Sequence, residues 1–482
     1  MSRYVGSLRY LAGLVLLSTT PLAVGFGEAW DFTPRVSLSQ DYSDNIRLAP
    51  PGDEDSEFIT QLNTGFSLNR DGGRARARVG YNLQSLFYWQ DSSDSTLFQQ
   101  FFGDGRVDLI PEQLYIDSAA SFSQRQLTRE SAGADNLNLD SGRGNVLTFR
   151  VSPVYIQQFD DVATGRLRYS YDRVDIQDSE DSNSQRNTVS LSINSGPQFT
   201  RFGWGLSVNY AQTDFDDGAS STQKNAEALG SWAITDRLDL FAVLGYEQDE
   251  FEQDNGRSDP DGIVWRLGST YEPSARTLLE AFFGERFFGT TYGATARHRL
   301  RNSQFILDYT ESVTSVNQFE IDQTIPRGVN ATIEESLIVD GEPFLFDLET
   351  PAVRSGSFVS KRLSAAYTGQ RRKLGWGVRV FHELRDFEVS NDSEEAQSFA
   401  GNLSWRWRPR TSVFANANLQ ESTFAGQDGE ETLYSTQLGI SRQLGNQVSA
   451  SVRYSYRDLD SSRPGNEGYQ ENRVSATLQK TF

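Results

Sequence analysis

Hydrophobic and polar residues alternate with a period of two along most of the chain after Trp30. The stretch 72–91, GGRARARVGYNLQSLFYWQD, shows the pattern, because its even positions from 74 to 84 are cationic or polar apart from Gly80 and its odd positions are mostly apolar. Such alternation puts the two kinds of side chain on opposite faces of a β-strand. Comparable segments of about 10 to 15 residues recur as far as the C-terminus, so the pattern predicts an all-β protein.

The connections between these segments are alternately short and long. Short connections are centred on Asp71-Gly72-Gly73, Pro111-Glu112, Thr235-Asp236-Arg237, Pro273-Ser274-Ala275, Arg301-Asn302, Pro409-Arg410 and Gly445-Asn446. Long connections cover 46–56, 127–144, 178–184, 251–261, 316–355, 389–396 and 461–467. Short periplasmic turns and long outer loops are typical of membrane-spanning β-barrels, whose closure satisfies every backbone hydrogen bond inside lipid. A soluble solenoid or multi-domain β protein is the alternative, but no repeat of fixed length supports a solenoid.

Tryptophan placement favours the same topology. Six tryptophans lie next to the short turns: Trp30, Trp204, Trp232, Trp376, Trp405 and Trp407. Trp89 and Trp265 lie next to the long connections. Aromatic girdles at the two membrane interfaces have this arrangement.

The N-terminus has the features of a secretory signal. Arg3 and Arg9 form a basic region, and the apolar run YLAGLVLL at 10–17 is too short to span a bilayer. Ala23-Val24-Gly25 fits a cleavage site, so we expect residues 1–27 to be a signal peptide and residues 28–482 to form the barrel. The chain has no cysteine, which excludes disulfide bonds.

These features predict a single large antiparallel transmembrane β-barrel of about 22 strands, within a range of about 18 to 24, in the outer membrane of a Gram-negative bacterium. The strand pattern begins at Trp30, whereas a plug domain would need on the order of 100 residues before it. We therefore expect no plug domain and no energised siderophore-type transporter. The longest loop, 316–355, is rich in apolar residues and is interpreted as a constriction or lid. The terminal Phe482 fits a signal for the barrel-assembly machinery, although Lys480 departs from it.

Charges are sorted between the two ends. The net charge of −20 argues against a nucleic-acid partner. Acidic residues gather in the long loops and basic residues near the short turns. An arginine facing lipid at mid-depth would cost about 2–4 kcal/mol, so alternation places the strand arginines in the lumen. The pore-lining candidates are Arg76, Arg78, Arg166, Arg168, Arg299, Arg379, Arg406, Arg408 and Arg453.

Two roles for these arginines stay open. They could pair with carboxylates of the wall, for which the candidates are Asp104, Asp172, Asp175, Glu383 and Asp458. Alternatively, they could focus a positive potential that attracts an anionic solute.

Residues suited to catalysis or metal binding are scarce. His298 and His382 are the only histidines, and neither has a serine and carboxylate nearby in sequence to form a nucleophile–base set. With two histidines and no cysteine, a metal site with nitrogen or sulfur ligands is not expected. We therefore expect no catalytic residue, no metal, no cofactor and no enzyme activity.

The opening segment carries a family resemblance. Residues 30–48, WDFTPRVSLSQDYSDNIRL, are similar to the PEP-CTERM system-associated outer-membrane barrel family, and QSLFYW at 84–89 and LYIDSAASFSQRQ at 114–126 resemble its next hairpins. The resemblance implies an association with exopolysaccharide synthesis and the exosortase system. It assigns no binding residues, and a broader similarity to exopolysaccharide-export porins is one of fold.

The resulting hypothesis is a porin-like conduit for exopolysaccharide export, with an anionic polysaccharide as a partner beside outer-membrane lipid and lipopolysaccharide. A non-conducting structural or scaffold barrel is the alternative, and an outer-membrane enzyme is the third hypothesis.

Overall fold

The computed structural model describes residues 30–126, 133–139, 142–177, 183–216, 218, 220–252, 261–315, 338–339, 342–343, 357–387, 392–424 and 428–482. The expected signal peptide and nearly all of the 316–355 loop lie outside these ranges and stay predictions. Within the described ranges, no helix is long and apolar enough to cross a membrane.

Twenty-two long strands form one sheet. The first half consists of β1 (Asp31–Ser43), β2 (Glu57–Asp71), β3 (Ala75–Tyr88), β4 (Thr96–Ile110), β5 (Leu114–Gln126), β6 (Arg143–Phe159), β7 (Ala163–Ile176), β8 (Ser184–Ser195), β9 (Phe202–Phe215), β10 (Ser220–Thr235) and β11 (Leu238–Glu252). The second half consists of β12 (Asp261–Ser274), β13 (Thr277–Arg286), β14 (Gly289–Arg299), β15 (Ser303–Ser315), β18 (Ser357–Arg371), β19 (Leu374–Phe387), β20 (Ser393–Arg408), β21 (Thr411–Thr423), β22 (Glu430–Gln443), β23 (Val448–Ser461) and β24 (Tyr469–Thr481). Three short elements lie outside this sheet: the 3-10 helix Ser92–Asp94, β16 (Ile338–Val339) and β17 (Glu342–Pro343).

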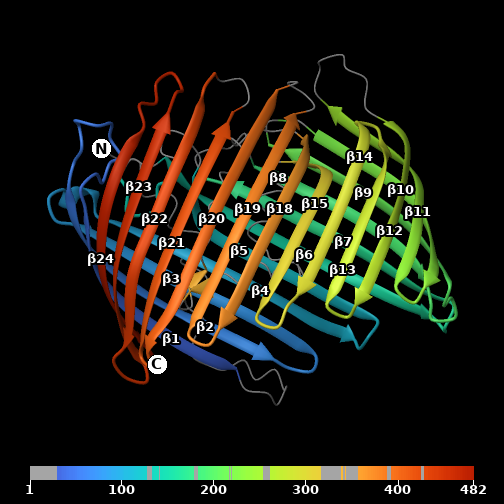
Figure 1. The fold of residues 1–482 in the computed structure, drawn as a ribbon, viewed down its shortest axis with the longest axis horizontal. Coiled ribbons are helices and arrows are strands. Elements are labelled where there is room, and N and C mark those ends of the chain that lie inside the picture. Colours follow the sequence, from blue (N-terminus) through green and yellow to red (C-terminus); the bar gives the residue numbers. More distant parts are fainter. Residues whose placement is uncertain are drawn as a thin grey trace.

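The sheet closes on itself. Each strand pairs antiparallel with the next along the chain, and β1 also pairs with β24, so that Leu38 faces both Leu62 and Leu478 across its two neighbours. Figure 1 shows the resulting barrel of tilted strands, with tight turns at one end and longer loops at the other. Closure leaves no strand edge unpaired, which is what a sheet needs in order to sit in hydrocarbon. The number and antiparallel order of the strands match the sequence pattern.

The two faces of the wall differ as the alternation predicts. On β24, Tyr469, Glu471 and Arg473 are buried, while Val474 and Leu478 are exposed on the other face. A protein surface in contact with water does not carry a continuous belt of exposed Leu, Val, Phe and Trp side chains. The outer face of the barrel therefore contacts lipid. Most tryptophans are exposed at the ends of the strands, including Trp30, Trp89 and Trp405, which confirms the predicted girdles. The protein is an outer-membrane β-barrel.

We predict that an arginine on the lipid face destabilises the barrel far more than one on the lumen face at the same depth. Val208 of β9 is exposed on the outer face, and the adjacent Ser207 faces the lumen. Val208→Arg should lower the free energy of unfolding in phospholipid vesicles by about 2–4 kcal/mol, because a cation enters hydrocarbon. Ser207→Arg, the matched control, should change it little. Equal effects in denaturant titrations would contradict the assigned faces.

Candidate functional site inside the loop end of the barrel

Two loop segments fold back onto the inside of the wall at the loop end of the barrel. They are residues 44–49, after β1, and residues 133–139, between β5 and β6; together we call them the inner layer. The segments pack on lumen-facing side chains of the strands from β22 round to β4, in two hydrophobic clusters. The first contains Leu48, Ala134, Leu433, Leu459 and Tyr469, and the second contains Ile46, Ile59, Leu86 and Tyr88 with Phe98, Leu137 and Leu139 packed against them.

Burying these apolar side chains explains why the segments stay inside the barrel. Ile46 is 1% exposed and Ile59 on the wall is fully buried. Burial of an aliphatic side chain contributes about 1.5–3 kcal/mol. The inner layer is therefore a small core of its own, built between loop and wall.

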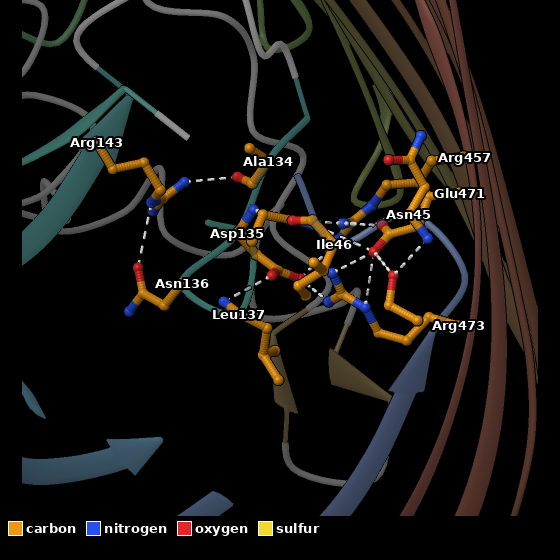
Figure 2. Close-up of polar contacts among 12 residues, drawn as sticks. Asn45, Ile46, Ala134, Asp135, Asn136, Leu137, Arg143, Arg457, Glu471 and Arg473 are labelled. Carbon is orange, nitrogen blue, oxygen red and sulfur yellow. Dashed lines mark hydrogen bonds and ion pairs between the residues drawn. The ribbon is translucent and has the colours of Figure 1, made fainter. Parts of the chain in front are cut away.

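Asp135 anchors the inner layer to the wall by charge (Figure 2). Its Oδ2 accepts hydrogen bonds from Arg457 Nη2 of β23 at 2.9 Å and from Arg473 Nη1 of β24 at 2.6 Å. The same two guanidinium groups contact Glu471, with Arg473 Nη2 at 2.6 Å from Oε1 and Arg457 Nη1 at 3.1 Å from Oε2. Two carboxylates and two guanidinium groups thus form one compact, charge-balanced cluster on the lumen side.

Glu471 is the buried centre of this cluster. It is 1% exposed, and a carboxylate at that burial needs several donors to offset its desolvation. Besides the two arginines, Ser43 Oγ donates to Glu471 Oε1 at 2.7 Å and Asn138 Nδ2 donates at 3.1 Å. Donors from β1, β23, β24 and the 133–139 segment therefore meet at one side chain.

Backbone contacts complete the attachment. Leu139 N donates to Ile46 O at 3.0 Å, which joins the two segments of the inner layer. Tyr88 Oη donates to Leu137 O at 2.8 Å, and Arg143 Nη1 donates to Ala134 O at 2.7 Å. The backbone of the segment 133–139 is thereby bonded to side chains of β3 and β6 and to the backbone of the first loop.

Local turn chemistry shapes the segment before it meets the wall. Asp135 Oδ1 accepts from Leu137 N at 3.0 Å, and Asn138 Oδ1 accepts from Asp135 N at 3.0 Å, so side chains close the turn. Gly133 has φ +78°, and a Cβ there would lie 2.9 Å from Leu433. The positive φ favours glycine at this position, and a larger residue would also have to displace the end of the Leu433 side chain.

The electrostatic balance favours ionised Asp135. Burial alone raises the pKa of a carboxyl group, but Arg473 and Arg457 outweigh it and hold the pKa of Asp135 well below its usual range. The side chain still keeps 35% of its surface exposed toward the lumen.

Wall carboxylates pair with arginines at several of the predicted places. Arg78 Nε lies 3.0 Å from Asp104 Oδ1, Asp172 pairs with Arg150, and Glu383 lies 2.7 Å from Arg385. These three carboxylates confirm the interpretation of an ion-paired wall. Two expected partners are wrong, because strand alternation puts Asp175 and Asp458 on the outer face, where they contact Arg173 and Tyr456 respectively.

The nine candidate arginines do not form one ring. Strand alternation gives the lumen face to Arg76, Arg78, Arg166, Arg168, Arg299, Arg379, Arg406 and Arg453. Arg78 and Arg168 contact wall carboxylates, with Arg168 Nη2 3.3 Å from Asp117. Arg408 differs, because the β20–β21 pairing shifts register between Trp405 and Arg408 and pairs Arg408 with Thr411. Its guanidinium lies 4.7 Å over the ring of Trp407.

The histidines lie on the outer face at opposite ends of the barrel. His298 Nδ1 is 2.8 Å from Thr277 Oγ1 beside a turn. His382 Nε2 is 2.9 Å from Glu395 Oε1 toward the loop end. Among the described residues, no three His, Cys, Asp or Glu side chains are placed to hold a metal ion.

The inner layer was not found from the sequence, where 127–144 is only a long connection. The stretch Asp135-Asn136-Leu137-Asn138-Leu139 did carry a signal, since two leucines alternate with polar residues inside a loop. Such alternation indicates a segment with one buried side. It does not indicate which surface buries it.

Comparison with solved structures shows barrels of the same fold. A variant of the FrpB iron transporter from Neisseria meningitidis has a TM-score of 0.54 at 8% identity, with 94% of this chain and 83% of that chain covered. A second FrpB variant has a TM-score of 0.52 at 10% identity, covering 94% and 82%. A mutant of the ferric enterobactin receptor PfeA from Pseudomonas aeruginosa has a TM-score of 0.50 at 10% identity, covering 94% and 80%. No protein-family profile and no curated protein matches the chain.

These similarities correct two expectations. The expected class of plug-free barrels, set apart from siderophore-type transporters, is wrong, because the fold is shared with siderophore and iron receptors, a class that has a plug domain. Twenty-two strands are also the size at which outer-membrane transporters have a plugged lumen. The expected exopolysaccharide-export conduit is wrong for the same reason, since the neighbours are uptake receptors. The resemblance to the PEP-CTERM-associated family stays a prediction.

We predict that Asp135→Asn releases the 133–139 segment while the barrel stays closed. The amide keeps the shape of the carboxylate but leaves the charges of Arg457 and Arg473 without one of their two counterions. Hydrogen exchange should show faster exchange at Leu137 and Leu139, with unchanged protection in β23 and β24. Asp458→Asn, on the outer face of β23, is the control and should have no effect there. Unchanged exchange at Leu139 in Asp135→Asn would contradict the anchoring role.

Acid should release the segment only well below the ordinary carboxyl range. A group whose pKa is lowered by folding contributes stability above its unfolded pKa and loses that contribution as pH falls through the folded pKa. We therefore expect exchange at Leu139, corrected for its intrinsic pH dependence, to stay constant from neutral pH to below about 4, the ordinary value for aspartate. Release with a midpoint near that ordinary value would show that the two arginines do not stabilise ionised Asp135.

Proposed function

We propose that this protein is an outer-membrane uptake protein that admits a small ligand from outside through the barrel. The inner layer carries the proposal, because it places a shaped, charge-anchored surface inside the loop end, where a ligand from outside arrives. The fold shared with iron and siderophore receptors supports transport over catalysis.

The inner layer covers one part of the wall at the loop end, from β22 to β4. Elsewhere at the loop end, the lumen face of the strands carries buried polar side chains such as Thr213 of β9 and Glu247 of β11. A ligand that enters the loop end therefore meets the inner layer on one part of the wall and polar strand side chains on another. Ligand sites commonly combine apolar surface with a few placed polar groups, and the mixed composition of the inner layer meets that description.

A ferric siderophore is the first ligand class to test. The support comes from the neighbours, since one is an iron transporter and another a ferric enterobactin receptor. The paired state of Asp104, Asp172 and Glu383 gives the lumen a balanced wall instead of a single-sign ring, which suits a compact ligand better than a long polyanion.

Uptake of radiolabelled ferric siderophores tests the proposal in cells that lack their own siderophore receptors. Cells that express the wild-type protein should accumulate iron from at least one ferric siderophore, and Asp135→Asn should change that uptake several-fold. Asp458→Asn should leave uptake unchanged. Expression in the outer membrane without uptake of any ferric siderophore, together with a steady ion current in planar bilayers, would replace the proposal with a passive pore.

A further inference from the structure

The turn end of the barrel carries its charge on one side. The ranges 294–307, 366–378, 402–414, 438–453 and 474–482 contain the turns and strand ends from β14 to β24, and none of them contains an Asp or Glu. Their cations are Arg297, Arg299, Arg301, Arg371, Arg372, Lys373, Arg406, Arg408, Arg410, Arg442, Arg453 and Lys480. We call this part of the turn end the cationic arc.

The rest of the turn end is mixed in charge. Acidic residues at the turns of β4 to β13 are Asp108, Glu112, Asp160, Asp161, Asp236, Asp239 and Glu272. They accompany Arg201, Arg237 and Arg276, which are exposed in the turns of the same part of the barrel. The turns on that side thus contain acidic side chains, whereas the ranges of the cationic arc contain no Asp or Glu.

Several cations of the arc point outward to the membrane instead of inward to the lumen. Arg408 and Arg442 both pair with Thr411 of β21, so they stand in one row across three strands. On β22, Arg442 follows the exposed Leu438 and Ile440 on the outer face. The register shift in β20 turns Arg408 to the same face, an effect typical of a β-bulge.

Lys480 extends this row toward the closing strand pair. It pairs with Val448 of β23 and with Val36 of β1, which is exposed on the outer face. A lysine at the end of a membrane strand reaches the headgroup level with its amine while its stem covers apolar surface.

Aromatic rings accompany the outward cations on neighbouring strands. Lys480 Nζ lies 4.2 Å over the ring of Phe482, and Arg408 lies 4.7 Å over Trp407. Arg70 of β2 lies 5.2 Å over Trp30. Rings of this kind sit at the level of the lipid headgroups, so the cations beside them are held at the depth of the phosphates.

We propose that the cationic arc binds anionic phospholipid headgroups of the periplasmic leaflet. The row Arg408, Arg442 and Lys480 supplies the positive charge, and the adjacent rings cover the upper part of the acyl chains. An acidic periplasmic protein is the other polyanion that could meet this charge, but the outward direction and the aromatic flank favour lipid. Polybasic surfaces at a membrane select anionic lipids by this electrostatic attraction.

Lipid retention measured by native mass spectrometry tests the proposal on the full-length protein. The protein is reconstituted in nanodiscs of phosphatidylethanolamine and phosphatidylglycerol. After the protein is released from the nanodisc in the mass spectrometer, the lipids of each kind that stay bound to it are counted. The wild-type protein should retain phosphatidylglycerol in preference. The triple variant Arg408→Gln, Arg442→Gln and Lys480→Gln should reduce that preference roughly fivefold or more, because each cation near a membrane surface contributes to anionic-lipid binding.

The matched control removes the same number of charges from the mixed side. The triple variant Arg201→Gln, Arg237→Gln and Arg276→Gln should leave the preference for phosphatidylglycerol unchanged. Correct assembly of each variant is checked separately: a folded barrel stays folded in detergent in the cold. The proposal is overturned if the wild-type protein shows no preference for phosphatidylglycerol, as expected if the arc binds an acidic protein. It is equally overturned if both triple variants lose the preference to the same extent.

Discussion

The pairing of β1 with β24 is the constraint on which the rest of the structure depends. Hydrocarbon offers no partner for a backbone N–H or C=O, so a sheet in the membrane is stable only when its first and last strands meet. Once the barrel closes, alternation sends Leu38 and Leu478 to lipid and their neighbours to the lumen. The same closure brings Ser43 of the first strand within 2.7 Å of Glu471 of the last, and so creates the place where the inner layer attaches.

Charge is used in two ways in this barrel. At the loop end, the carboxylates of Asp135 and Glu471 form short ion pairs with Arg457 and Arg473. These charges neutralise one another and hold a loop segment against the wall. At the turn end, Arg408, Arg442 and Lys480 face outward where no carboxylate of the adjoining turns accompanies them. The first arrangement shapes the entrance of the lumen, and the second presents charge to the surroundings.

Much of the fold was predictable because β-structure is encoded locally. The alternation in 72–91 predicted a strand, which the structure has as β3, and turn residues such as Pro111-Glu112 marked strand ends. Local rules failed at Arg408, where a one-residue register shift beside the turn reverses the face. Local rules could not predict the inner layer either, because Asp135 and Arg457 are 322 residues apart in the sequence. The expectation of a barrel unlike the siderophore receptors was wrong, because the position of the first strand does not fix the fold class, whereas a 22-stranded barrel shares its fold with those receptors.

The sequence by itself determined the strands, their two faces and the girdle tryptophans, because each follows from spacing within about 15 residues. Only the tertiary structure decided which loop returns into the lumen and which arginines are neutralised. Those outcomes depend on groups that closure brings together from the two ends of the chain. Neither the apolar pattern of Leu137 and Leu139 nor the charge of Asp135 identifies the wall that receives them until the wall exists.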